Sequence, residues 1–266
     1  MRVRAEWFGG LVESGDSIVA VDRAAMRALG VSSSARWSPA HPRRLSAPIE
    51  AQLELSQRCT AGCSFCSVNA TRDGAELSLA RALAIVDDLA RRGVFTLALG
   101  GGEPLEHPHV FAIAAHARAL GLWVTLTTAG LALDDDCAAR CAVFHAVHVS
   151  LRPCGAPALA KLARVHPRVG VNVILAHHRL GDVDEAIALA SSLSLCAVQV
   201  LRLKREGRAL AHYDERAPTV ADERALHDRV RRAAAQGIRV RVDATLAGLF
   251  GPLPVPAPDE ACVVVR

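Results

Sequence analysis

Aromatic residues and a strong charge of either sign are scarce in this chain. Of its 266 residues only 4% are aromatic, and the formal net charge is +4. Lysine and arginine form no long run at any point in the sequence. Proteins that bind nucleic acids usually concentrate basic residues on one face and add aromatic groups for stacking. We therefore expect no nucleic-acid partner.

Long apolar segments are missing as well. The best apolar run, 111–128, is interrupted by His116 and Arg118, whereas a membrane-spanning helix needs about 20 apolar residues. The first residues, 1–8, lack the apolar centre of a signal peptide. Eight cysteines in a chain of this length are too few for a secreted disulfide scaffold. These features predict a cytoplasmic protein without a membrane partner.

Three of the eight cysteines are crowded into one short segment. Cys59, Cys63 and Cys66 follow directly on a strand-like run at 49–55. Three thiolates so close together can bind three irons of a [4Fe–4S] cluster, because cysteine is the usual ligand of such clusters. No fourth protein ligand lies nearby in the sequence, which would leave one iron open to a small molecule. A structural zinc site normally takes four protein ligands, yet a non-catalytic zinc or iron–sulfur protein remains an alternative.

Strands and helices alternate from residue 49 onward. Apolar strand-like runs occur at 50–55, 95–100, 123–128, 146–151, 169–175 and 197–203. Helical patterns separate them at about 79–92, 109–120, 134–142, 156–165 and 182–193, followed by a helix at 220–235 and a strand at 238–242. Such alternation produces βαβ units around a parallel sheet. The sequence therefore predicts an α/β fold, a partial (β/α)6 TIM-like barrel over residues 49–243.

The segments on either side of this barrel are predicted to be separate. Residues 1–30 form a small hairpin-plus-helix unit, with two strands joined at 14–16 and a helix capped by Asp22. Residues 31–48 are rich in Ser, Pro and Arg and are interpreted as a linker. Residues 244–266 are left as a C-terminal extension.

Unusual residues follow several of the predicted strands. In parallel α/β folds, ligands bind beyond the carboxyl ends of the strands. Gly101-Gly102-Glu103-Pro104 follows the second strand, where glycines would allow a ligand close to the backbone and Glu103 would offer a carboxylate to a cationic group. Taken alone, such a turn is more often purely structural. Ser150 ends the fourth strand, where its hydroxyl suits a ribose but is equally explained by simple strand termination.

The cysteine motif with Phe65 before its last cysteine, followed about 35 residues later by Gly-Gly-Glu-Pro, resembles the radical S-adenosylmethionine (SAM) superfamily. The resemblance covers 49–243. It implies a [4Fe–4S] cluster and S-adenosylmethionine as cofactors. The residues implied as cluster ligands are Cys59, Cys63 and Cys66. The residues implied in binding S-adenosylmethionine are Phe65 against the adenine, Gly101, Gly102 and Glu103 at the amino group, and Ser150 and Arg152 as further contacts.

The same resemblance implies an activity. An external one-electron donor of the flavodoxin or ferredoxin type would reduce the cluster, which would cleave S-adenosylmethionine to a 5′-deoxyadenosyl radical that abstracts hydrogen from a substrate. The run 4–12, followed by the hairpin and helix, resembles the beginning of radical SAM enzymes that modify ribosomally made peptides. Their recognition element binds a leader peptide as an added strand. We therefore expect a peptide substrate, with a small molecule of cofactor or antibiotic biosynthesis as the alternative.

The C-terminal region departs from one branch of that family. The segments 201–208 and 240–243 resemble enzymes that continue into a cysteine-rich SPASM or twitch region with auxiliary clusters. In this sequence only Cys262 follows residue 243. We expect no auxiliary cluster in this chain, and no individual residue is predicted to be catalytic.

Overall fold

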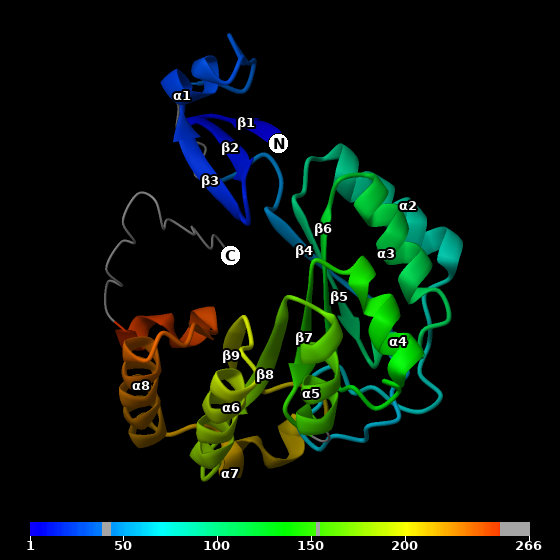
Figure 1. Cartoon of the computed structure of the whole chain (residues 1–266), viewed down its shortest axis with the longest axis vertical. Helices are drawn as coiled ribbons and strands as arrows, with labels where there is room; N and C mark the ends of the chain where they lie inside the picture. Colours follow the sequence, from blue (N-terminus) through cyan, green and yellow to red (C-terminus); the bar gives the residue numbers. More distant parts are fainter. Residues whose placement is uncertain (39–43, 153–154, 251–266) are drawn as a thin grey trace.

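The computed structural model describes residues 1–38, 44–152 and 155–250, which form a small N-terminal unit and a larger α/β barrel (Figure 1). Part of the predicted linker (39–43) and most of the predicted C-terminal extension (251–266) lie outside the described residues.

The barrel is built on one parallel sheet. Its strands in sequence order are β4 (Glu50–Ser56), β5 (Thr96–Gly101), β6 (Trp123–Thr128), β7 (Ala146–Ser150), β8 (Val169–Leu175), β9 (Ala197–Arg202) and β10 (Val240–Val242). Their spatial order is β10-β9-β8-β7-β6-β5-β4, so sequence neighbours are also sheet neighbours and β4 and β10 remain edges. This confirms the predicted α/β fold as an open, partial barrel.

The helices lie on the outside of this sheet (Figure 1). They are α2 (Leu79–Arg91), α3 (Val110–Ala119), α4 (Asp135–Arg140), α5 (Gly155–Val165), α6 (Leu180–Ser192), α7 (Tyr213–Arg216) and α8 (Val220–Ala235). Short 3₁₀ helices are η1 (Pro104–Glu106), η2 (Cys141–Val143), η3 (Gly207–His212) and η4 (Ala244–Phe250). Across the described part of the chain, no helix combines the length and the apolar character needed to cross a membrane.

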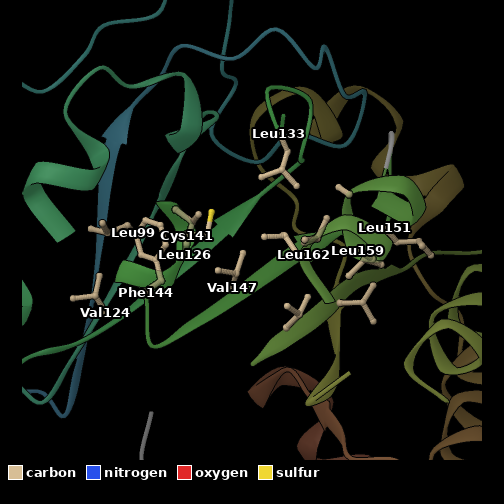
Figure 2. Packing of buried hydrophobic residues seen from close by; sticks show 14 of the residues in the cluster. Leu99, Val124, Leu126, Leu133, Cys141, Phe144, Val147, Leu151, Leu159 and Leu162 are labelled. Carbon is tan, nitrogen blue, oxygen red and sulfur yellow. The ribbon is translucent and has the colours of Figure 1, made fainter. Parts of the chain in front are cut away.

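The hydrophobic core lies between the sheet and the helices. Strand residues that face the helices are buried Val or Leu side chains, namely Leu97, Leu99, Val124, Leu126, Val147, Val149, Val171, Val173, Val198 and Val200. Figure 2 shows Leu126 and Val147 beside Phe144, which follows η2. Burying each such side chain contributes about 1.5–3 kcal/mol. The alternate positions of the same strands face the inside of the barrel and have a different composition, which is described below.

The N-terminal unit contains one strand more than the sequence predicts. Its elements are β1 (Val3–Glu6), β2 (Gly9–Ser14), β3 (Ser17–Asp22) and α1 (Arg23–Ala28). The strands form an antiparallel sheet in the order β1-β2-β3, so β3 is at an edge. The predicted β2–β3 hairpin is present, and the side chain of Asp22 caps α1 by accepting from the Ala25 N–H at 2.8 Å.

Two arginines, one directly before β1 and one within it, attach this unit to the barrel. Arg2 donates to the carbonyls of Val94 at 3.1 Å and Phe95 at 2.8 Å, and Arg4 donates to the carbonyl of Gly93 at 2.8 Å. Those three carbonyls lie immediately before β5. The unit therefore covers the end of the barrel at which the strands begin.

The tip of the β2–β3 hairpin contacts the same end of the barrel. Asp16 forms an ion pair with Arg168, which directly precedes β8. Glu13 accepts a hydrogen bond from the indole of Trp123, the first residue of β6, at 2.9 Å. The opposite end, where the parallel strands finish, carries the predicted site.

Candidate active site

The three cysteines of the predicted cluster lie in the loop that leaves the C-terminal end of β4, and all three are half-buried. Backbone amides already point at two of the sulfurs. The N–H of Ala61 donates to Cys59 Sγ at 3.4 Å, and the N–H of Ala70 donates to Cys66 Sγ at 3.3 Å. Hydrogen bonds of this kind tune thiolates that bind iron–sulfur clusters.

The electrostatics of the loop suit a positively charged group bound by the thiolates. Burial raises the pKa of the Cys59 and Cys63 thiols, and the nearby thiolates raise the pKa of Cys63 further. A bound metal group would deprotonate the thiols and relieve this repulsion. No three His, Cys, Asp or Glu side chains in the described ranges converge on a single metal ion. A [4Fe–4S] cluster needs no such convergence, because each thiolate binds a different iron.

Arg208, in η3 after β9, holds the cysteine loop in place. Its Nε donates to the carbonyl of Cys63 at 2.9 Å, its Nη1 donates to the carbonyl of Ala70, and its backbone N–H donates to the carbonyl of Cys66 at 2.9 Å. Gly207 makes this approach possible, since a Cβ there would lie 2.3 Å from the Cys66 carbonyl oxygen. No sequence motif points to Arg208, because its partner Cys63 is 145 positions away in the chain.

The two glycines of the Gly-Gly-Glu-Pro turn are required by the chain itself. A Cβ on Gly101 would lie 2.5 Å from the carbonyl oxygen of Ser56, and one on Gly102 would lie 1.9 Å from that of Arg58. The Gly102 N–H donates to Ser56 and the Glu103 N–H donates to Arg58, at 2.5 and 2.9 Å. The two glycines thus allow the beginning of the cysteine loop to pack against the turn, and their contact with the methionine amino group stays a prediction.

The Glu103 carboxylate points into the protein. The side chain is fully buried, and burial raises its pKa. One oxygen accepts from the Leu105 N–H at 3.0 Å and from the Thr128 hydroxyl at 2.7 Å, and the other accepts from the Ala129 N–H at 2.7 Å. The carboxylate thus connects the turn after β5 with the end of β6. A contact of Glu103 with the methionine amino group stays a prediction.

Phe65 and Ser150 lie near the C-terminal ends of barrel strands, the end at which a ligand is expected. Phe65 is half-buried in a small apolar cluster with Ala176, Leu203 and Ala209, which follow β8 and β9. Ser150 is half-buried at the last position of β7. Their contacts with S-adenosylmethionine remain predictions.

Arg152 has other partners. Its guanidinium forms ion pairs with Asp182, at 3.0 Å, and with Glu185, both on α6. These carboxylates raise its pKa. The charge of Arg152 is therefore already neutralised by α6, and its contact with S-adenosylmethionine stays a prediction.

Comparison with known proteins agrees with this arrangement. The Radical SAM superfamily profile matches residues 53–153. The chain is 30% identical over 204 residues to the mycofactocin maturase MftC of Mycobacterium ulcerans, covering 69% of this chain and 55% of that protein. It is 29% identical over 211 residues to the PqqA peptide cyclase of Streptomyces rochei, covering 71% of this chain and 57% of the cyclase. The chain thus spans little more than half the length of these relatives.

Among solved structures, SuiB of Streptococcus suis bound to its precursor peptide SuiA has a similar fold. The TM-score is 0.73 at 15% sequence identity, over 93% of this chain and 72% of SuiB. SuiB bound to S-adenosylmethionine gives the same TM-score over 95% of this chain. Residues 50–250 are a smaller fraction of this chain than the fraction that either SuiB structure covers. The likeness of fold therefore extends into the N-terminal unit.

Proposed function

Because the chain belongs to the radical SAM superfamily, we propose that it reductively cleaves S-adenosylmethionine at a [4Fe–4S] cluster and abstracts hydrogen from a ribosomally made peptide. The observation that carries the proposal is the cysteine loop at the end of β4, with the Gly101–Gly102 turn seated against it. The cofactors, when bound, supply the radical that removes the hydrogen atom. Electrons would come from an external donor of the flavodoxin or ferredoxin type.

In this proposal the chain binds and orients the cofactors. Cys59, Cys63 and Cys66 hold three irons of the cluster. Arg208 fixes the loop through its three hydrogen bonds to backbone carbonyls. The backbone of Gly101–Glu103 receives the methionine amino group, and the buried Glu103 carboxylate positions that backbone. Ser150 and Phe65 contact the nucleoside part.

The peptide substrate is supported by the relatives and by the edge strand β3. MftC is named a maturase and the PqqA enzyme a peptide cyclase. An extended peptide can add to an exposed sheet edge. The two-residue turn makes Ser14 and Ser17 a hydrogen-bonded pair. Along β3, every second residue then directs its N–H toward β2 and the residues between direct theirs away. The N–H groups of Ile18 and Ala20 therefore point away from β2.

Anaerobic reconstitution tests the enzymatic proposal. The wild-type protein should bind about four irons and four sulfides and form 5′-deoxyadenosine when given S-adenosylmethionine and a strong reductant. Cys63→Ala should lose the cluster, whereas Cys196→Ala, a half-buried thiol at the opposite end of the barrel, should keep it. A wild-type protein that holds a full cluster yet forms no 5′-deoxyadenosine contradicts the enzymatic proposal.

Substitution at the β3 edge tests the peptide. Ala20→Pro removes the outward N–H and should weaken binding of a candidate leader peptide, synthesised from any short reading frame found beside this gene, at least tenfold. Ala20→Ser keeps the N–H and should bind like the wild type. Deletion of 1–30 is a poorer test, because Arg2 and Arg4 also bind barrel carbonyls. Equal affinity of all three proteins refutes docking at β3.

A further inference from the structure

Polar side chains form a continuous row on the inner face of the barrel. The strand register aligns Ser150 of β7 with Asn172 of β8, Asn172 with Gln199 of β9, and Gln199 with Arg241 of β10. Residues paired in this way point to the same side of a sheet. The alternate positions of β7, β8 and β9 are the Val residues of the core, so this row lies on the face away from the helices.

The middle of the row contains buried polar atoms without partners. Asn172 is only 9% exposed, and within the described ranges its Oδ1 has no partner at hydrogen-bond distance, although the His148 ring is near enough to interact with this side chain. The Nε2 of Gln199, its neighbour in register, is likewise buried and unpartnered there. An unsatisfied buried polar group destabilises a folded protein. Such atoms persist at positions where a ligand supplies the missing partner.

His148 forms the wall beside these two amides. It stands two positions before Ser150 on β7, and its ring lies over Gly170, where a Cβ would be 2.7 Å from the ring Nδ1. Burial, reinforced by the positive charge of Arg241, lowers its pKa to about 4. The ring is therefore neutral at pH 7 and adds no charge to the site.

We propose that Asn172 and Gln199 bind the backbone amides of a substrate residue inside the barrel. Asn172 Oδ1 accepts from the N–H of that residue and Gln199 Nε2 donates to its carbonyl oxygen, because these two groups of an extended residue point the same way. A carboxylate has no N–H to donate to Asn172 Oδ1. An ammonium group has no oxygen to accept a hydrogen bond from Gln199 Nε2. The inference rests on the proposed peptide substrate, whose backbone repeats this group.

The position of the row suits substrate placement. Neighbouring strands lie about 5 Å apart, so an amide held by Asn172 is one strand away from Ser150, the proposed cofactor contact. The row thus begins beside the site of radical formation and leads away from it along the inner face. A peptide held there presents its neighbouring Cα or side chain toward the cofactor.

The test uses the reconstituted protein and N-acetylglycine N-methylamide, a minimal peptide mimic. Nitrogen-15 NMR of the side-chain amides should show saturable shifts for Asn172 and Gln199, and acetate at equal concentration should produce none. Asn172→Leu and Gln199→Met should weaken binding at least fivefold. Thr125→Val, a half-buried inner-face control on β6 outside the row, should bind like the wild type.

Stability separates a binding role from a structural one. An apolar replacement of similar shape removes the unsatisfied atom, so Asn172→Leu should unfold at the same or a higher urea concentration than the wild type. A loss of stability, unchanged probe affinity in both variants, or equal binding of acetate overturns the inference. Formation of 5′-deoxyadenosine without substrate is measured separately, so failure of the enzymatic proposal is distinguishable from failure of the amide site.

Discussion

At the scale of single residues, Glu103 shows how a motif residue can act through its buried side chain. Each carboxylate oxygen accepts a backbone N–H, from Leu105 and from Ala129. In Glu103→Gln, the amide nitrogen must face one of these donors, leaving it unsatisfied. We expect a loss of about 1–3 kcal/mol in the free energy of unfolding of the cluster-free protein, measured by urea denaturation.

The control for this change is Glu206→Gln, an exposed residue that caps η3 without a side-chain hydrogen bond. Its effect should stay within about 0.5 kcal/mol. If Glu103→Gln is as stable as this control, the carboxylate does not connect the turn after β5 with the end of β6 as described.

Arg208 gives a second prediction at this scale. The single ammonium group of Arg208→Lys cannot reach both the Cys63 and Ala70 carbonyls, because Lys lacks the planar fork of Arg. We expect lower iron content after reconstitution and, with an iron chelator present, a several-fold faster loss of visible absorbance. Arg205→Lys changes an exposed neighbour and should match the wild type. If Arg208→Lys also matches the wild type, the cysteine loop does not need the support of Arg208.

The sequence predicted residues whose chemistry is local and missed those that depend on distant partners. The three cysteines and the Gly-Gly turn stand out because each forms a short motif. The orientation of Glu103 depends on Thr128 at the end of the next strand. The role of Arg208 depends on the cysteine loop, which follows the first barrel strand in the sequence. No local pattern encodes either contact.

At the scale of elements, the start of α8 provides a prediction of pH dependence. Burial acts to raise the pKa of Asp222, but hydrogen bonds from Thr219 and His177 outweigh it and lower the pKa to about 2. Thr219 and Asp222 together form a capping box. The carboxylate therefore stabilises the fold while it is ionised.

For a lowered carboxyl pKa, the added stability is present above the unfolded-state value and is lost as the pH falls. The Asp222 contribution, at most about 2 kcal/mol, should be complete at pH 5 and should disappear between about pH 4 and pH 2. Urea denaturation of the cluster-free protein should show the wild type and Asp222→Asn converging over this range. A constant difference between the two proteins would disprove the assignment.

Regular elements were predicted well where apolar periodicity was strong. All strands of the barrel and its longer helices lie within a few residues of the predicted ranges. The strand β1 was missed because Arg4 and Glu6 occupy its inward positions, where a strand normally carries apolar residues. The predicted helix 134–142 divides into α4 and the 3₁₀ turn η2, a common way for a helix to tighten at its end.

At the scale of the whole molecule, a buried ion pair within β1 lies where the two units meet. Arg4 and Glu6 are 7% and 1% exposed, and Arg4 also donates to carbonyls of Ala47, Pro48 and Gly93. Glu6→Gln leaves a buried guanidinium without its counter-charge, so we expect a loss of roughly 3 kcal/mol in thermal or urea unfolding. Asp16→Asn removes an exposed ion pair with Arg168 and should change stability by less than about 1 kcal/mol. Equal effects of the two changes would contradict the role of Arg4.

The closure of one barrel end by the N-terminal unit sets a minimum spacing for any peptide that docks at β3. The seven residues of β8 span the height of the barrel, about 23 Å at 3.3 Å per residue. An extended chain needs at least about 7 residues to cover that distance. The protein would then act as a ruler: a peptide whose modified residue lies closer to its docked segment should bind normally and yet remain unmodified.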